Sequence, residues 1–156
     1  MKNILAKLAL VQADIDVMPK EGHNDHNNYN YLQETQVTTK IKELFDKHKV
    51  IFHYQSEILE TKEYQSSKGN TQFLVSVRVM YAFYDVDSGE CLPGRADGQG
   101  SDMGDKGIYK AITGAIKYIY MKTFNIPTGD DAEKDSPELK TKSQSNAPKK
   151  IESSPF

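Results

Sequence analysis

The stretch at residues 97–131, DGQGSDMGDKGIYKAITGAIKYIYMKTFNIPTGDD, determines how the rest of the chain is interpreted. Four glycines occur within ten residues near its start. Apolar residues then recur three and four positions apart, which predicts a helix over residues 106–124 with one buried face. Asp105 or Asp102 is expected to cap the start of this helix. The predicted buried face consists of Ile108, Ala111, Ile112, Ala115, Ile116 and Ile119.

The opposite face of this helix is basic. It carries Lys106, Lys110, Thr113 and Lys117, and no acidic residue occurs between positions 106 and 129. An ordinary solvated helix face mixes charges of both signs, because pairs four residues apart stabilise it. Cations with tyrosines beside them suit a surface that follows phosphates and stacks on bases. A solvated lysine-rich face without a ligand explains the same pattern.

Length and composition predict one domain at residues 1–129 and a tail at residues 130–156. The net charge is −2, so any nucleic-acid site must be a local patch. The single cysteine, Cys91, excludes an intrachain disulfide and fits the cytoplasm. No apolar run is long enough for a membrane span, and no signal peptide is expected.

The predicted tail is poor in large apolar residues and is expected to be disordered. It ends in Pro155 and Phe156. A terminal Pro-Phe resembles the partner-binding tip of bacterial single-strand-binding proteins, although chance also explains two apolar residues. A partner-binding role of the tail is therefore a hypothesis.

The other predicted elements give the order α-α-β-β-β-α. Helices are expected at residues 3–17, with Asn3 as the cap, and at residues 32–48. A period of two predicts three strands joined by tight turns, at residues 50–63, 71–85 and 90–96. The expected fold class is α+β, with an antiparallel three-stranded sheet covered by the helix at residues 106–124. The middle strand is long enough that it should bend or extend past its neighbours. Pro93 is expected to place the third strand at an edge or to mark a bulge in it.

Several catalytic and ligand-binding motifs fail on spacing. The glycines match neither a Walker A loop nor a dinucleotide-binding fingerprint. Aspartates at the two ends of the 106–124 helix are too far apart along it to share a metal ion. His23 and His26 lack further ligands at zinc spacing. The chain is therefore not expected to be an enzyme, and no catalytic residue, metal or cofactor is predicted.

The sequence at residues 98–131, together with HNNYNYLQE at residues 26–34, resembles the signature of the ERF (essential recombination function) family of phage single-strand-annealing proteins. The resemblance covers residues 1–131 and leaves out the tail. One departure is Ala132, where the pattern leads us to expect proline after Gly-Asp-Asp.

The resemblance implies a function that spacing alone does not show. Proteins of this family bind single-stranded DNA, anneal complementary strands without ATP and form rings or filaments. Their fold is similar to that of the eukaryotic strand-annealing recombinases, with a β-β-β-α core. They often act beside a single-strand-binding protein, which is the partner expected for the tail. The implied location is the cytoplasm of a bacterial host, with the gene carried by a phage or prophage.

Three groups of residues form the predicted DNA site. Basic side chains are expected to line a groove for the sugar–phosphate backbone: Lys106, Lys110, Lys117, Arg95 and Arg78. Tyr109 and Tyr120 are expected to stack on bases, and the backbone at Gly104 and Gly107 to approach phosphates near the helix start. The sequence leaves open whether Tyr29 and Tyr31 contact DNA.

Two other functions remain open. The basic helix face could contact an acidic protein in a partner-binding module that does not anneal DNA. A metal-dependent nuclease, the less favoured alternative, would cleave strands in the presence of magnesium.

Overall fold

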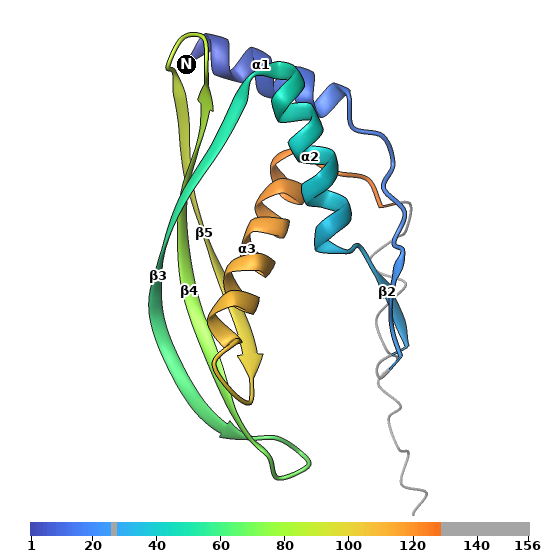
Figure 1. Ribbon diagram of the computed structural model, residues 1–156, viewed down its shortest axis with the longest axis vertical. Coiled ribbons are helices and arrows are strands. Elements are labelled where there is room, and N and C mark those ends of the chain that lie inside the picture. Colours follow the sequence, from blue (N-terminus) through green and yellow to red (C-terminus); the bar gives the residue numbers. More distant parts are fainter. Residues whose placement is uncertain (26–27, 129–156) are drawn as a thin grey trace, which may run out of the picture.

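The computed structural model describes residues 1–25 and 28–128, which form an arch (Figure 1). One arm is a long three-stranded sheet with a helix lying on it, and the other arm ends in a small hairpin (Figure 1). The elements are α1 (Lys2–Ala13), β1 (Gly22–Asn24), β2 (Tyr29–Tyr31), α2 (Glu34–His48), β3 (Val50–Gln65), β4 (Thr71–Asp85), β5 (Cys91–Asp102) and α3 (Gly107–Thr123).

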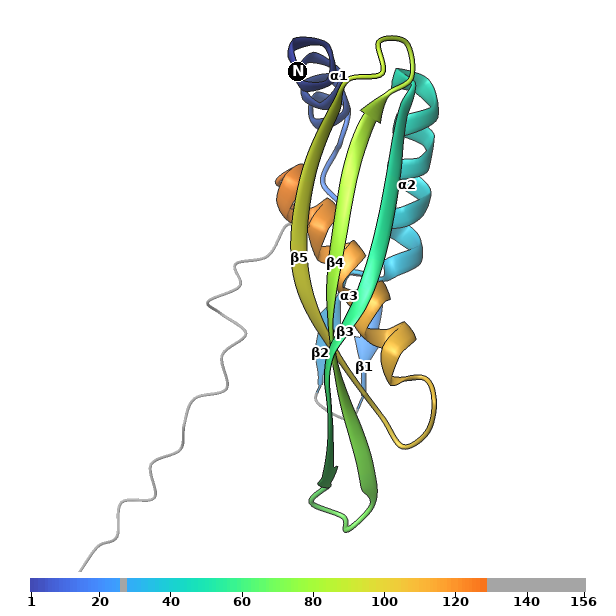
Figure 2. The same cartoon turned by 90° about the vertical axis from the view of Figure 1, so that its left-hand side faces the viewer.

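The large sheet has the strand order β3-β4-β5, and both pairings are antiparallel. The helix α3 covers its inner face, while within the described residues no helix covers the outer face (Figure 2). These features confirm the predicted α+β class and the sheet with its covering helix. The β1–β2 hairpin is an additional two-stranded sheet that sequence analysis did not predict. Among the described residues, no helix is long and apolar enough to cross a membrane.

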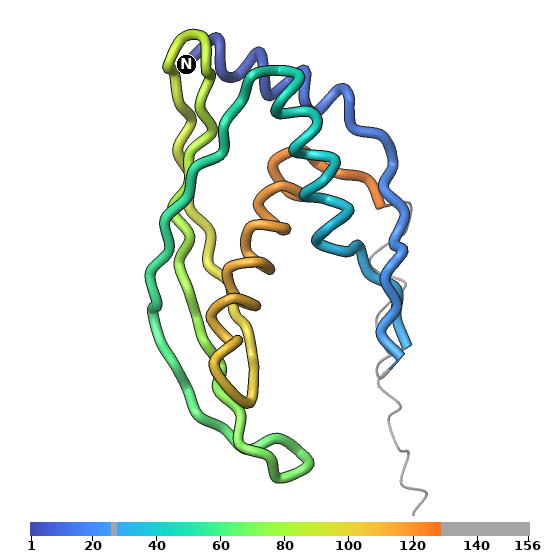
Figure 3. The backbone as a smooth tube through the Cα atoms, in the orientation of Figure 1, coloured from blue at the N-terminus to red at the C-terminus, as the bar shows by residue number. Residues whose placement is uncertain are grey.

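The central strand β4 has the predicted bounds, because strict alternation of apolar residues defines it. Its inner face carries buried Val75, Val77, Val79 and Phe83. The pairing with β3 shifts register between Ile58 and Glu60, where β3 contains a bulge. Bulges bend and twist a strand, and the backbone of the sheet is visibly curved (Figure 3). The bend expected of so long a strand is therefore confirmed.

The edge strand β5 is longer than predicted. It continues beyond Ala96 to Asp102, so that Gly98 and Gly100 lie inside a strand rather than in a loop. Both glycines face α3: a Cβ on Gly100 would lie 2.4 Å from the amide nitrogen of Ala111, and one on Gly98 would lie 2.8 Å from Cβ of Ala115. The absence of side chains therefore lets α3 lie directly on β5.

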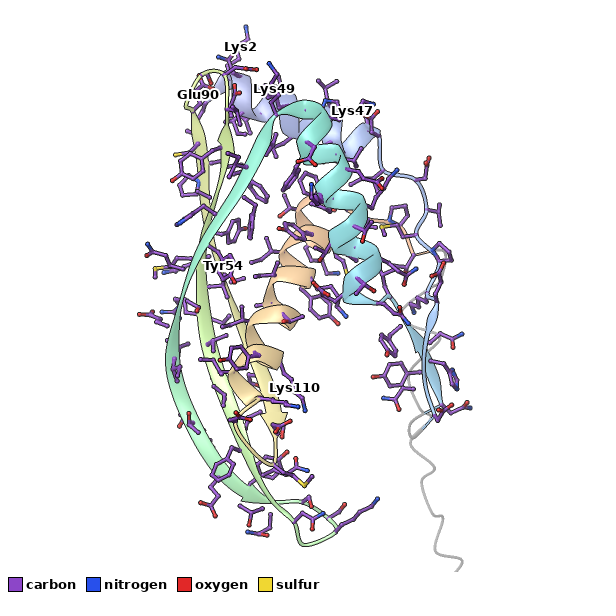
Figure 4. The ribbon with its side chains drawn as sticks, in the orientation of Figure 1. Lys2, Lys47, Lys49, Tyr54, Glu90 and Lys110 are labelled. Carbon is purple, nitrogen blue, oxygen red and sulfur yellow. The ribbon has the colours of Figure 1, made fainter. Side chains whose placement is uncertain are left out.

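The start of α1 is capped from a distant turn. Glu90 lies beside the first turn of this helix (Figure 4), where its Oε2 accepts hydrogen bonds from the backbone N–H groups of Asn3, at 2.8 Å, and Ile4, at 3.2 Å. A carboxylate at this end also complements the helix dipole. The prediction that Asn3 itself is the cap is wrong, since a residue from the β4–β5 turn performs that role.

The start of α3 also differs from the prediction. Within the described chain, no side chain caps this helix at Lys106. Asp102 instead accepts a hydrogen bond from the N–H of Gly104 at 2.9 Å and so orders the turn that leads into the helix. The prediction of Asp105 or Asp102 as the N-cap is therefore wrong.

A single core joins the helices to the inner face of the sheet. At its centre the ring of Phe45 from α2 makes edge-to-face contacts with three other rings, each with ring centroids 5.9 Å apart. Such contacts stabilise the core beyond the burial of area alone. The three rings belong to Phe83, Tyr120 and Phe124.

Asp85 is a buried carboxylate at the end of β4 that holds α1 in place. It accepts hydrogen bonds from Lys7 Nζ, from Ser88 Oγ at 2.7 Å and from the N–H of Asp87 at 2.9 Å. These donors, with Lys7 first, lower the pKa of Asp85 well below its ordinary value. Ionised Asp85 therefore stabilises the folded state above about pH 4, and this contribution is lost as the pH falls towards the lowered pKa.

Replacing Asp85 should change how stability depends on pH. Asp85→Asn is expected to lower the melting temperature at neutral pH, and the difference from the unsubstituted protein should shrink as the pH falls below about 4. Thermal melting across a pH series measures both effects. Asp46→Asn, which removes an exposed pair with Lys42, serves as the control with little effect. A difference that stays constant with pH would contradict the assignment.

The glycine contact makes a second prediction. Gly100→Ala should destabilise the fold by about 1–3 kcal/mol, because its Cβ would overlap backbone atoms of α3. Gly114 lies within α3, and no atom lies within 4 Å of a Cβ added there. Gly114→Ala should therefore stabilise the fold by up to about 1 kcal/mol, because alanine favours a helix more than glycine does. Chemical denaturation measures both free energies of unfolding. Equal stability of the two variants would show that the close approach is unimportant.

Candidate nucleic-acid interface

The exposed side of α3 brings three of the predicted lysines together. Lys106, Lys110 and Lys117 line a shallow hollow of about 600 Å³ with Tyr109. Lys110 lies on the side of α3 that is turned towards the β1–β2 hairpin (Figure 4). Two acidic residues, Glu34 and Asp105, also line this hollow. Its charge is therefore positive on balance but not uniformly so.

Lys110 and Lys117 differ in the intramolecular contacts that their ammonium groups make. Lys110 donates hydrogen bonds to the carbonyl of Ser101 at 3.1 Å and to Asp102, whose pKa it lowers. Lys117 donates to the backbone carbonyl of Leu32 at 3.3 Å, and its Nζ lies 5.1 Å from the centroid of the Tyr118 ring. The charge of Lys110 is thus partly neutralised by a carboxylate, whereas Lys117 keeps its charge over an aromatic face.

The structure does not bring both predicted arginines to these lysines. Arg78 alternates with buried Val77 and Val79, so it lies on the outer face of the sheet, away from α3. Arg95 is opposite Met80 on the edge strand β5, and it lines a hollow together with Tyr118 and Lys122 of α3. The structure therefore places Arg78 apart from the lysines of α3, whereas Arg95 lies beside the C-terminal half of that helix.

Arg78 also has a partner within the sheet. Its guanidinium donates to both carboxylate oxygens of Asp97, at 2.8 and 3.0 Å. This pairing raises the pKa of Arg78 and lowers the pKa of Asp97. A bidentate pair of this kind fixes both side chains, so Arg78 is a cross-strand contact of the sheet.

The two predicted tyrosines have different positions. Tyr109 is 66% exposed, whereas Tyr120 is 8% exposed and packs 4.9 Å from Phe52 between ring centroids. Burial raises the pKa of the Tyr120 phenol. Tyr120 belongs to the core and cannot present its ring to a base in this structure.

Sequence analysis missed Tyr118, which is 55% exposed. A signal for it exists in the sequence, because Tyr118 and Lys122 follow Lys110 by eight and twelve residues. This spacing places Tyr118 and Lys122 on one side of Lys110, rotated about 80° and 120° from it around the helix. The exposed face of α3 is therefore wider than the stripe that was predicted.

The two predicted glycines serve the turn and the packing of α3. The N–H of Gly104 already donates to Asp102. Gly107 is buried at the first residue of α3, and a Cβ there would lie 2.9 Å from Cγ2 of Val75. The structure gives Gly107 the same role as the strand glycines, namely close contact between helix and sheet.

A second hollow, which we call the hairpin hollow, lies between the β1–β2 hairpin and the C-terminal half of α3. It has a volume of about 520 Å³ and shares Lys117 with the first hollow. None of the described residues that line it is acidic. Its charged and aromatic members are Lys20, Lys117, Lys122, Tyr29, Tyr31 and Tyr118.

The hairpin is fastened beside α3 by contacts at its base. The N–H of Met18 donates to the carbonyl of Pro127 at 2.9 Å, and the side-chain amide of Gln36 donates to the carbonyl of Pro19 at 3.2 Å. These bonds connect the segment that enters the hairpin to the end of α3 and to α2. They hold the segment that precedes the hairpin.

The comparisons with known proteins support the resemblance seen in the sequence. A family model described as the ERF superfamily matches residues 4–155. The match includes residues 130–155, although sequence analysis placed the tail outside the resemblance. The search of curated proteins gave no match to this chain. In the part of the chain that the structure describes, no group of three or more His, Cys, Asp or Glu residues could hold a metal ion.

The positions of the two tyrosines predict effects on stability of very different size. Tyr120→Ala should cost about 3–5 kcal/mol, because it removes a buried ring from the aromatic core. Tyr109→Ala should change stability by no more than about 0.5 kcal/mol, since that ring is exposed. Urea denaturation of the two variants measures these changes. A small loss for Tyr120→Ala would show that its ring is not part of the core in solution.

Proposed function

The chain belongs to the ERF superfamily, and from this premise we propose that it binds single-stranded DNA and promotes ATP-independent annealing of complementary strands. Membership in this family is consistent with a role in phage recombination and annealing in general. The observation that carries the proposal is the exposed side of α3, whose lysines and tyrosines line two hollows. The two hollows meet at Lys117.

The dimensions of this surface suit a short stretch of one strand. From Lys106 to Lys117, which lie on one face, the helix rises about 17 Å, which matches roughly five phosphates at the spacing of a B-form strand. Lys106, Lys117 and Lys122 are suited to contact phosphates. Tyr109 is suited to stack on a base, since base–aromatic stacking tolerates any sequence. A protein that anneals arbitrary complementary strands requires this tolerance.

No energy source is needed for the proposed reaction. Pairing two complementary strands is favourable, because stacking contributes roughly 1.4 kcal/mol per base-pair step. The protein has to hold each strand extended and bring the two strands together. We therefore propose that the chain acts by binding, without a catalytic residue, a metal or a nucleotide cofactor.

Self-association is part of the proposal, because one copy offers few cations. On a single strand, each phosphate that the protein neutralises lowers the logarithm of affinity by about 0.7 for every tenfold rise in salt concentration. The electrostatic part of the affinity therefore grows with the number of phosphates contacted, and a single copy, which contacts few, would bind weakly. Assembly into a ring or filament adds contacts along one strand. The strands β3 and β5 are natural contacts, since no other strand of the described chain covers their outer edges.

The remaining expectations concern the setting of the protein. We propose that residues 130–156, which lie outside the described residues, bind a single-strand-binding protein. We also propose that the chain acts in the cytoplasm of a bacterial host. Both rest on the family resemblance and on the composition of the tail.

The proposal is tested by removing two lysines from α3. Lys106→Ala with Lys117→Ala should weaken binding of a labelled oligonucleotide and reduce the magnitude of the salt slope by roughly 1.4. It should also slow annealing of two complementary oligonucleotides in the absence of ATP and metal. Fluorescence anisotropy across a salt series measures binding, and energy transfer between labelled strands measures annealing.

A matched control removes the same charge elsewhere. Lys42→Ala with Lys68→Ala alters α2 and the β3–β4 turn, and it should leave both the salt slope and the annealing rate close to those of the unsubstituted protein. Equal behaviour of the two double variants would contradict the assignment of the interface to α3. Failure of the unsubstituted chain to bind or anneal at low salt would overturn the proposed function.

A further inference from the structure

We propose that the hairpin hollow is a base-stacking subsite, in which Tyr29, Tyr31 and Tyr118 hold unpaired nucleobases of a single strand. The inference rests on the proposed function and assigns a distinct task to one part of the surface. The lysines along α3 bind phosphates, and the hairpin hollow binds bases only when they are unpaired. It thereby distinguishes a single strand from an annealed duplex.

The arrangement of the three rings supports this assignment. Tyr29 and Tyr31 are two residues apart on β2 and therefore lie on the same side of the hairpin. Their ring centroids are 6.1 Å apart at an interplanar angle of 60°. Tyr118 lines the same hollow from α3, on the other wall. Aromatic rings from two elements thus border a space large enough for a planar base.

The exposure of Tyr29 and Tyr31 indicates that their rings bind a ligand. Tyr29 is 44% exposed and Tyr31 is 37% exposed, and neither belongs to the hydrophobic core. Exposed aromatic rings that gather on one concave surface are typical of a binding site rather than of a solvated face. The side-chain amide of Asn125, which also lines the hollow, can donate to and accept from base edges.

The charges around the hollow select an anion. Lys20, Lys117 and Lys122 line it, and the described lining residues include no carboxylate. The first hollow along α3, by contrast, contains both lysines and acids. A nucleotide combines a planar ring with a negative phosphate, and the combination of rings and lysines fits both parts.

The local structure holds one ring ready for a base. Gly22 lies directly beneath the ring of Tyr31, where a Cβ would come within 2.8 Å of the ring carbons. The side chain of His23 is hydrogen-bonded to Asn30 across the hairpin at 2.7 Å. A ring positioned before the ligand arrives loses less conformational entropy on binding.

The geometry favours single strands over the annealed product. A base within a duplex stacks on its neighbours on both sides, so its faces cannot reach the tyrosines. An unpaired base can stack on an aromatic side chain. When two strands pair, their bases leave the tyrosines, and only the phosphate contacts remain. The subsite therefore weakens binding of the product relative to the substrate.

Comparison of an ordinary oligonucleotide with an abasic one of the same length separates base contacts from phosphate contacts. The full chain should bind the ordinary strand more tightly than the abasic strand. Tyr29→Ala with Tyr31→Ala should weaken binding of the ordinary strand by at least about tenfold and leave binding of the abasic strand unchanged. Tyr29→Phe with Tyr31→Phe should retain the preference for bases, because the rings remain. Fluorescence anisotropy measures the affinity of each of the three proteins for both strands.

The control substitutes two tyrosines of similar exposure on the outer face of the sheet. Tyr64 is 40% exposed and Tyr84 is 38% exposed, and changing both to alanine should leave the preference for bases intact. Equal binding of ordinary and abasic strands by the unsubstituted chain would overturn the inference while leaving the proposed function in place. An equal loss for both strands in the Tyr29→Ala, Tyr31→Ala variant would overturn it too. If the unsubstituted chain binds an acidic peptide but no oligonucleotide, both the inference and the proposed function fail.

Discussion

The contact of α3 with β5 through bare glycine backbone is the constraint on which the rest of the structure depends. Gly98, Gly100 and Gly107 have no side chain at the crossing, and a Cβ at any of them would meet a neighbouring atom at less than 3.0 Å. The helix therefore lies flat on the sheet, with its small residues Ala111 and Ala115 buried beneath it. The segment that leads into the β1–β2 hairpin is hydrogen-bonded to the chain just after this helix, through Met18 and Pro127.

Sequence patterns correctly predicted the helices and strands that are determined by their own residues. Alternation of apolar residues gave β4 its correct bounds. The three-and-four spacing found the buried Ala111, Ala115 and Ile119 of α3, while the other three residues of the predicted face are partly buried. The predicted third strand ended at Ala96, before the glycines of β5. The reason for these glycines is a helix that crosses the strand, and the strand's own sequence does not show it. The cap of α1 could not be found for the same reason, since Glu90 lies far along the chain.

The errors at the candidate site have a different origin. Helical spacing predicted the shared face of Lys106, Lys110 and Lys117, but the arginines were added on charge alone. Alternation along β4 already placed Arg78 opposite its apolar face, so the sequence contained the signal that separates it from α3. Tyr120 borders the apolar stripe, and its burial depends on Phe45 and Phe52, which come from other elements. The hairpin hollow required the three-dimensional structure, because its walls come from residues about ninety positions apart.

The capping of α1 by Glu90 has a consequence for the order in which the protein forms. The bonds from Asn3 to Glu90 and from Lys7 to Asp85 span 87 and 78 residues. A ribosome releases α1 long before it makes these acceptors, and an isolated helix of twelve residues is marginal in water. The β-meander, by contrast, forms from neighbouring hairpins with short loops. The first helix to be synthesised is therefore among the last to dock, and until then its apolar stripe is exposed to chaperones and to other nascent chains.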